Sequence, residues 1–304
     1  MRNTEGYILI IFAGVLYGSI PIFATLLANL DVSTMEQIFV RLLLSVIAFL
    51  IFFRSTKKGL PKLEKRDYFH FFLFGLVGIA LFFSLYMSAA VMIGVTITVL
   101  LLYTQPIYTL ILSRLILHAR IGLWGIAAIV FSMAGIAIIF KIWSMQWEKF
   151  GLGYIFGLCT GLLYTVYIIF MRVYSRKYNS PTITFWAFLF GLLWLIPLWL
   201  VFRILSPIAE MTALKINLEP NAWLLLLGFT IIPTLLAYLI FNRGMKYVEP
   251  HRAGVLVLSE PLSAIIMSLL ILGQPIFFTD LLGGALILVS FLLLKLDRNA
   301  QRRI

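Results

Sequence analysis

The sequence predicts an all-α integral membrane protein whose ten transmembrane helices form two inverted repeats of five helices. Three observations predict it: 62% of the residues are hydrophobic and only 12% are charged, long apolar runs recur along the chain, and residues of the first half reappear in the second. A typical soluble domain carries about 25% charged residues, which cover its surface with polar groups. Lipid is therefore the expected solvent for most of this chain.

Apolar runs of about 20 residues, the length that a helix needs to cross the hydrocarbon core, define the ten predicted helices. In the first half these runs lie near 7–27, 34–53, 69–88, 93–115 and 121–140. In the second half they lie near 152–172, 182–202, 222–241, 252–272 and 278–295. Most connecting loops are short, so we expect consecutive helices to be antiparallel neighbours.

Lys and Arg are distributed unevenly between the two sets of loops. If the N-terminus is cytoplasmic, every basic residue falls on the inner side except Arg41, which lies within a helix, and four residues of the outer loops, Lys141, Lys149, Arg203 and Lys215. This bias predicts a multi-pass protein of the cell membrane with both termini in the cytoplasm. It also explains the net charge of +12, so we expect no nucleic-acid partner.

The two halves share residues at fixed offsets. A shift of 155 positions aligns Gln105-Pro106 with Glu260-Pro261, each near the centre of a predicted helix. A shift of 147 positions aligns Tyr17 with Tyr164 in the first helix of each half. The repeats therefore correspond to residues 1–147 and 148–304.

Each repeat contains five helices, an odd number, so the second repeat enters the membrane from the opposite side. Inverted repeats are typical of transporters that expose a site near the bilayer midplane alternately to each side. The alternative is that the duplication only built a stable helical bundle.

Several segments at equivalent places in the two halves resemble the EamA-type members of the drug/metabolite transporter superfamily. They are Phe39-Val40-Arg41, Leu102-Tyr103-Thr104-Gln105-Pro106, the segment 242–250 and Leu258-Ser259-Glu260-Pro261. His118-Ala119-Arg120 departs from the family, which more usually has a Gly-Glu-Arg-like turn there. The resemblance implies a membrane transporter rather than an enzyme, in a family whose members export amino acids and other small metabolites.

Four polar side chains lie near the predicted midplane: Tyr17, Gln105, Tyr164 and Glu260. A carboxylate at that depth must pair, face water or take up a proton, so Glu260 is expected to contact substrate or a coupling proton. The alternative is a protonated or hydrogen-bonded Glu260 that stabilises helix packing. Pro106 and Pro261 lack an amide hydrogen and are predicted to free the carbonyls of Leu102 and Val257 and to make their helices flex.

Arg41 is the only basic residue well inside a predicted helix. It is expected to pair with Glu36 or Glu260, to extend toward the interface, or to bind an anionic group of the substrate. Tyr86, Tyr103 and Tyr238 are pocket or gate residues in the same interpretation, with ordinary packing as the alternative. The predicted substrate-binding residues are thus Tyr17, Arg41, Tyr86, Tyr103, Gln105, Tyr164, Tyr238 and Glu260.

Motifs for other chemistries do not occur in the sequence. It contains no GxxxxGK[ST], HExxH or GxSxG pattern, and its three histidines are widely separated. We therefore expect no ATP-driven pump, no metal and no cofactor, apart from a possible coupling proton. The leading hypothesis is a secondary transporter that exports amino acids or related compounds by alternating access around a central cavity, as a monomer or homodimer. The alternatives are a flippase for a lipid-linked headgroup and an intramembrane transferase, for which no cluster of acids or histidines is present.

Overall fold

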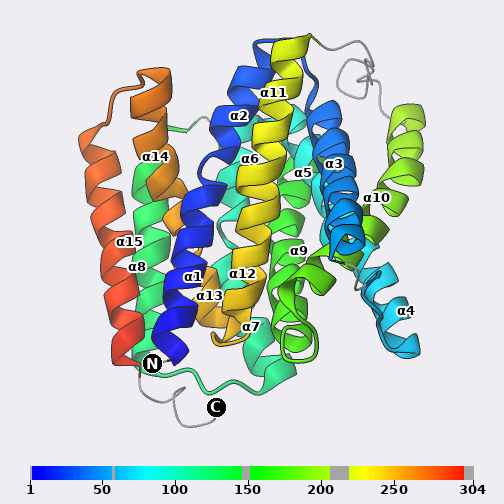
Figure 1. Cartoon of the computed structure of the whole chain (residues 1–304). Helices are drawn as coiled ribbons and strands as arrows, with labels where there is room; N and C mark the ends of the chain where they lie inside the picture. The colour runs from blue at the N-terminus through cyan, green and yellow to red at the C-terminus, as the bar shows by residue number, and fades with distance from the viewer. Residues whose placement is uncertain (1, 57–58, 146–150, 206–218, 298–304) are drawn as a thin grey trace.

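The computed structural model describes residues 2–56, 59–145, 151–205 and 219–297, and within these ranges every regular element is helical (Figure 1). The first half contains α1 (Arg2–Tyr17), α2 (Ile20–Ala28), α3 (Thr34–Ser55), α4 (Lys65–Phe74), η1 (Gly75–Leu81), α5 (Phe82–Ile93), α6 (Val95–Leu102), α7 (Gln105–Leu117), α8 (Leu123–Ile139) and η2 (Ile142–Ser144). The second contains α9 (Leu152–Tyr174), α10 (Ser180–Leu205), α11 (Pro220–Phe229), η4 (Thr230–Leu236), α12 (Ala237–Met245), α13 (Pro250–Leu256), α14 (Ser259–Leu272) and α15 (Phe278–Leu296).

These elements join into ten membrane crossings, as predicted. Among the described residues, nine stretches of one or more successive helices are long and apolar enough to cross a membrane, and α8, with 17 residues, is the shorter tenth. The first crossing differs from the expected single helix because it is interrupted at Gly18-Ser19, between α1 and α2. Large apolar side chains such as Leu123, Leu270 and Phe278 are exposed on the outside of the bundle, which suits a surface that contacts lipid.

Local sequence signals begin several of these helices. Ser33 and Glu36 form a capping box at the start of α3, with Ser33 Oγ accepting from the Glu36 amide (3.1 Å) and Glu36 Oε2 from the Ser33 amide (2.8 Å). Asn179 Oδ1 accepts from the Thr182 amide (3.0 Å) and so caps α10. Pro220 and Pro250 occupy the first positions of α11 and α13, where their missing amide hydrogen removes no helical bond.

The internal repeat extends to the irregularities of the backbone. Both π-helices, η1 and η4, lie in the third crossing of their half and are 155 residues apart. The fourth crossing is broken at Tyr103-Thr104 in one half and at Val257-Leu258 in the other, an offset of 154 and so within one residue of the same register. The helices that follow end at His118 and Gly273, both left-handed, with φ of 50° and 67°. Equivalent chain segments therefore adopt equivalent deviations from a regular helix.

The two halves pack against each other helix by helix. The first crossing of the second half, α9, lies along α5, α6 and α7 of the first half. In the same way α1 lies along α12 and α14, while α8 and α15 pair with each other. Each half thus buries its apolar faces largely on the other half, so the helices that carry polar side chains meet between the halves.

One end of the bundle carries the charged side chains that hold helices together, and we call it the basic end. Helix α1 begins there and α15 ends there (Figure 1). Within the described residues, every ion pair lies at this end: Lys177 with Glu64 (2.5 Å) and Asp67 (2.7 Å), Arg172 (2.6 Å) and Arg176 (3.9 Å) with Glu249, Arg243 with Glu5 (3.3 Å), Arg252 with Asp297 (3.5 Å) and His70 with Asp67 (3.6 Å). Hydrogen bonds to Asp67 and Glu64 raise the pKa of Lys177 above its ordinary value, so Lys177 stays positively charged.

Candidate functional site

Glu260 is the second residue of α14, directly after the break in the fourth crossing of the second half. Its neighbours fix α14 to α1: Ser259 Oγ donates to the Ile11 carbonyl (2.9 Å) and Ser263 Oγ donates to the Val15 carbonyl (3.1 Å). This contact requires glycine on α1, because a Cβ at Gly14 would lie 2.1 Å from Ser259 Oγ. Close packing of α1 therefore positions the carboxylate.

Five tyrosines lie near Glu260, and all five are among the candidates named from the sequence. The Tyr103 hydroxyl lies close enough to the Glu260 carboxyl group to interact with it directly. The other four lie close enough for their hydroxyls to interact electrostatically with this carboxyl group: Tyr17, Tyr86, Tyr164 and Tyr238. They come from α1, α5, α9 and α12, and Glu260 and Tyr103 add α14 and the break after α6. The site is thus assembled from both halves.

Four side chains of this cluster retain solvent-accessible surface although they lie inside the helix bundle. Glu260, Tyr86, Tyr164 and Tyr238 are only half-buried by accessibility, yet protein atoms enclose each of them. Tyr17 and Tyr103 are buried.

Tyr167 links the cluster toward the basic end and was not predicted. Its ring lies 5.6 Å from that of Tyr238 and 5.9 Å from that of Tyr164, measured between ring centroids. Its hydroxyl donates to Asn242 Oδ1 (2.8 Å), and Asn242 Nδ2 donates to Thr184 Oγ1 (2.9 Å). The available signal was its spacing, because Tyr167 follows Tyr164 by three residues and shares its helix face.

Arg41 lies between two aromatic rings of α5 and α11. Its guanidinium carbon is 4.5 Å from the centroid of Phe83 and 4.9 Å from that of Phe229, and the residue is 7% exposed. Arg41 Nε has no hydrogen-bond partner, and no ion pair within the described residues includes Arg41. The expected pairing with Glu36 or Glu260 is therefore wrong. Glu36 lies five positions from Arg41, off its helix face, and instead caps α3.

Gln105 occupies the position equivalent to Glu260 but has a different environment. It is completely buried, and its Nε2 donates to the Gly254 carbonyl (2.6 Å). Its own backbone carbonyl accepts from Thr165 Oγ1 (3.2 Å). Gln105 thus joins α7 to α13 and α9 and, unlike Glu260, has no accessible surface.

The two prolines lie just after the helix breaks. Pro106 is the second residue of α7 and Pro261 the third of α14, so each begins a new helix. The expected free carbonyl at Val257 is wrong, because it accepts from the Glu260 amide (2.9 Å). That short bond spans the break and replaces the helical bond that the proline cannot donate.

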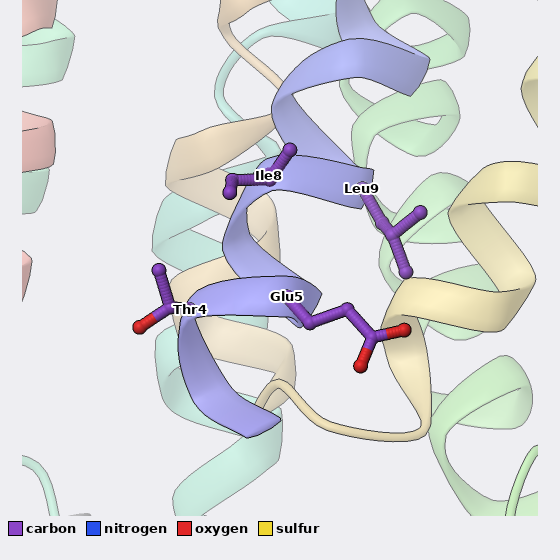
Figure 2. Close-up of a pocket in the computed structure, with 4 residues that line it drawn as sticks. All are labelled: Thr4, Glu5, Ile8 and Leu9. Carbon is purple, nitrogen blue, oxygen red and sulfur yellow. The ribbon is translucent and has the colours of Figure 1, made fainter. Parts of the chain in front are cut away.

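A hollow on the surface of α1 lies at the basic end and is lined by Thr4, Glu5, Ile8 and Leu9 (Figure 2). Glu5 is within 3.3 Å of Arg243 there. The hollow is open and shallow and contains none of the predicted site residues, so we do not regard it as the functional site.

Comparison with known proteins agrees with this architecture. The EamA-like transporter family matches the chain twice, at residues 4–141 and 151–296. An uncharacterized transporter of Archaeoglobus fulgidus is 27% identical over 288 residues, 93% of this chain and 94% of the relative. The uncharacterized transporter YdfC of Bacillus subtilis is 27% identical over 264 residues, 85% of this chain and 81% of YdfC.

Two further matches bear on the membrane location and the fold. The uncharacterized inner membrane transporter YicL of Salmonella typhimurium is 36% identical over 73 residues, 24% of each chain. One solved crystal structure superposes with a TM-score of 0.80 over 99% of this chain and 100% of the other, at 16% identity. The fold is thus shared with a known protein, and the duplicated family match covers nearly the whole chain. This protein is a multi-pass membrane transporter of the EamA-like transporter family, within the drug/metabolite transporter superfamily.

Proposed function

We propose that this protein is a secondary transporter that exports amino acids or related small zwitterions by alternating access. One observation carries this proposal: Arg41 and Glu260 lie in the same aromatic interior without pairing with each other. Tyr86 and Tyr238 interact electrostatically with both of them. A substrate carboxylate bound at Arg41 and a substrate ammonium bound at Glu260 would satisfy both charges at once.

The depths of the two residues support this geometry. Glu260 follows the start of α13 by ten residues, which is roughly 15 Å of helix or about half of the hydrocarbon thickness. Arg41 follows the start of α3 by seven residues, roughly 10 Å from the opposite end of the bundle. The anionic group of the substrate would thus bind on the side of Glu260 that faces away from the basic end.

The accessible surface of the enclosed side chains supports a central cavity. Glu260, Tyr86, Tyr164 and Tyr238 keep this surface inside the bundle, so they would line the cavity. Tyr17 and Tyr103 would form its walls, and Gln105 would hold the helices around it. The aromatic rings offer apolar contact to the rest of the substrate.

In this proposal the protein lies in the cell membrane, the basic end faces the cytoplasm, and both termini are cytoplasmic. The excess of Lys and Arg at this end supports that orientation. The two family matches support repeats that correspond to residues 1–147 and 148–304, although the boundary itself lies outside the described residues, as do Lys149 and Lys215. Glu260 is the residue through which a proton would be coupled to transport.

Counterflow in proteoliposomes tests this function. Vesicles containing the full chain and loaded with an unlabelled amino acid should accumulate the labelled one, with saturation and with competition by related zwitterions. Amines that lack a carboxylate and acids that lack an amine should compete more weakly. A broad panel of amino acids and related metabolites without saturable exchange would refute the proposal.

A further inference from the structure

A second pocket lies at the basic end, between the segment that joins α9 to α10 and the end of α12. Four of its lining residues are basic, namely Arg176, Lys177, Arg243 and Lys246, and none of the described residues that line it is acidic. The remaining lining residues are mostly hydroxyl, amide and aromatic side chains. This composition favours an anion that accepts hydrogen bonds.

Two of the four cations are available to a ligand. Lys177 is held by Asp67 and Glu64, and Arg243 is within 3.3 Å of Glu5. Arg176 has only a distant contact with Glu249 (3.9 Å), whose closer partner is Arg172 (2.6 Å). Lys246 is exposed and belongs to no ion pair within the described residues.

The position of the pocket adds to its charge. The first residues of α10, Ser180 and Pro181, line it, so the positive end of a 26-residue helix opens onto the same space. Asn242, which is 1% exposed, also lines the pocket. The pocket lies where membrane-spanning helices end, which is the level of lipid phosphates.

We propose that this pocket binds the phosphate of an anionic phospholipid through Arg176 and Lys246. The phosphate would bridge the α9–α10 connection and α12. Asn242 connects the pocket to Tyr167 by one hydrogen bond, so the lipid would stabilise the packing of α9, α10 and α12 at the basic end. This assignment is independent of the transported substrate.

Thermal unfolding of the purified full chain in mixed micelles tests the site. Added phosphatidylglycerol should raise the melting temperature of the wild type with a saturable midpoint, and phosphatidylcholine should not. Lys246→Ala and Arg176→Ala should each raise the lipid concentration at the midpoint about fivefold. Lys295→Ala is the matched control, because it removes an exposed lysine of the same end outside the pocket, and it should leave the midpoint within about twofold.

Three results would overturn the proposal. The first is equal stabilisation by phosphatidylglycerol and phosphatidylcholine. The second is an equal rise of the midpoint concentration in Lys295→Ala and Lys246→Ala, which would mean that only overall charge matters. The third is saturable stabilisation by inorganic phosphate at matched ionic strength without phosphatidylglycerol, lost in Lys246→Ala, which would replace the lipid with a free anion.

Discussion

The two halves share their backbone but use one equivalent position for different purposes. In the first half Gln105 is completely buried and bonded to the Gly254 carbonyl. In the second half Glu260 keeps accessible surface and is surrounded by tyrosines. The π-helix is nevertheless repeated with an offset of 155 and the helix break with an offset of 154. The duplication therefore preserved the irregular backbone, while side chains made one copy a structural contact and the other the centre of the candidate site.

The first crossings of the two halves differ as well. The first crossing of the first half is interrupted at Gly18-Ser19, whereas that of the second half, α9, is continuous. A Cβ at Gly14 would lie 2.1 Å from Ser259 Oγ, but a Cβ at the equivalent Gly161 would lie 3.1 Å from Thr104 Oγ1. The helix that positions Glu260 is thus packed more tightly than its counterpart beside Gln105.

The largest expected effect comes from exchanging the two equivalent polar residues. Glu260→Gln should lower transport tenfold or more, a loss of about 1.4 kcal/mol, because it removes the charge that faces the substrate or proton. Gln105→Glu should reduce transport less, since Gln105 does not contact the same space. Initial rates in proteoliposomes across pH 5 to 9 measure both. Wild-type rates for Glu260→Gln at every pH would exclude Glu260 from the mechanism.

Arg41 has no charged counterpart in the second half, where α10 carries no charge before Arg203. Arg41→Ala should weaken binding of a zwitterion by about 2 kcal/mol, the range for a desolvated charge contact. Arg41→Lys should recover only part of this affinity, because an ammonium group cannot stack as a plane between Phe83 and Phe229. Isothermal titration or competition of exchange gives the affinities. Arg41→Ala with the affinity of the wild type would place the carboxylate site elsewhere.

Gly14 and Gly161 test whether the first crossings of the two halves are packed with different tightness. Gly14→Ala should destabilise the protein by about 1–3 kcal/mol, because the added methyl group would clash with Ser259 Oγ and the Val257 carbonyl. Gly161→Ala would place its Cβ 3.1 Å from Thr104 Oγ1, a tight contact that a small shift of the neighbour relieves, and should have the smaller effect. Melting temperatures in detergent measure the difference. Equal shifts for the two variants would show that the two first crossings are packed alike.

Substitution of the left-handed residues at the ends of α7 and α14 should give the smallest change in stability. His118 adopts φ 50° and Gly273 adopts φ 67°. His118→Gly should stabilise the protein and Gly273→Ala should destabilise it, each by about 1 kcal/mol, because a Cβ is unfavourable in this conformation. Melting temperatures should shift in opposite directions. A shift in the same direction for both would contradict the equivalence of the two helix ends.

Much of the fold could be predicted from the sequence because its signals are local or repeated. The length of the apolar runs indicated the ten crossings, and the offset of Gln105-Pro106 and Glu260-Pro261 indicated the repeat. The interruption at Gly18-Ser19 was not predicted, although Pro21, which lies at the start of α2, is a local signal for it. The break there accompanies contact of Gly18 with Ser263 and the Glu260 carbonyl on α14, which no local pattern reveals.

The site was predicted in outline but not in its contacts. The residue types, and the depths of Glu260, Tyr17 and Tyr164, were sufficient to identify Glu260 and the five tyrosines as candidates. The pairing of Arg41 was wrong because Phe83 and Phe229 come from distant helices. Tyr167 was missed because its importance depends on Asn242, 75 residues away.

The sequence by itself determined that this chain spans a membrane ten times in two related halves, because apolar length and repeated residues are properties of the chain alone. Only the tertiary structure decided that Glu260 keeps accessible surface while Gln105 is enclosed, and that every ion pair within the described residues gathers at the basic end. Equivalent residues acquire different roles because each is surrounded by helices of the other half, and those surroundings exist only once the halves have packed together.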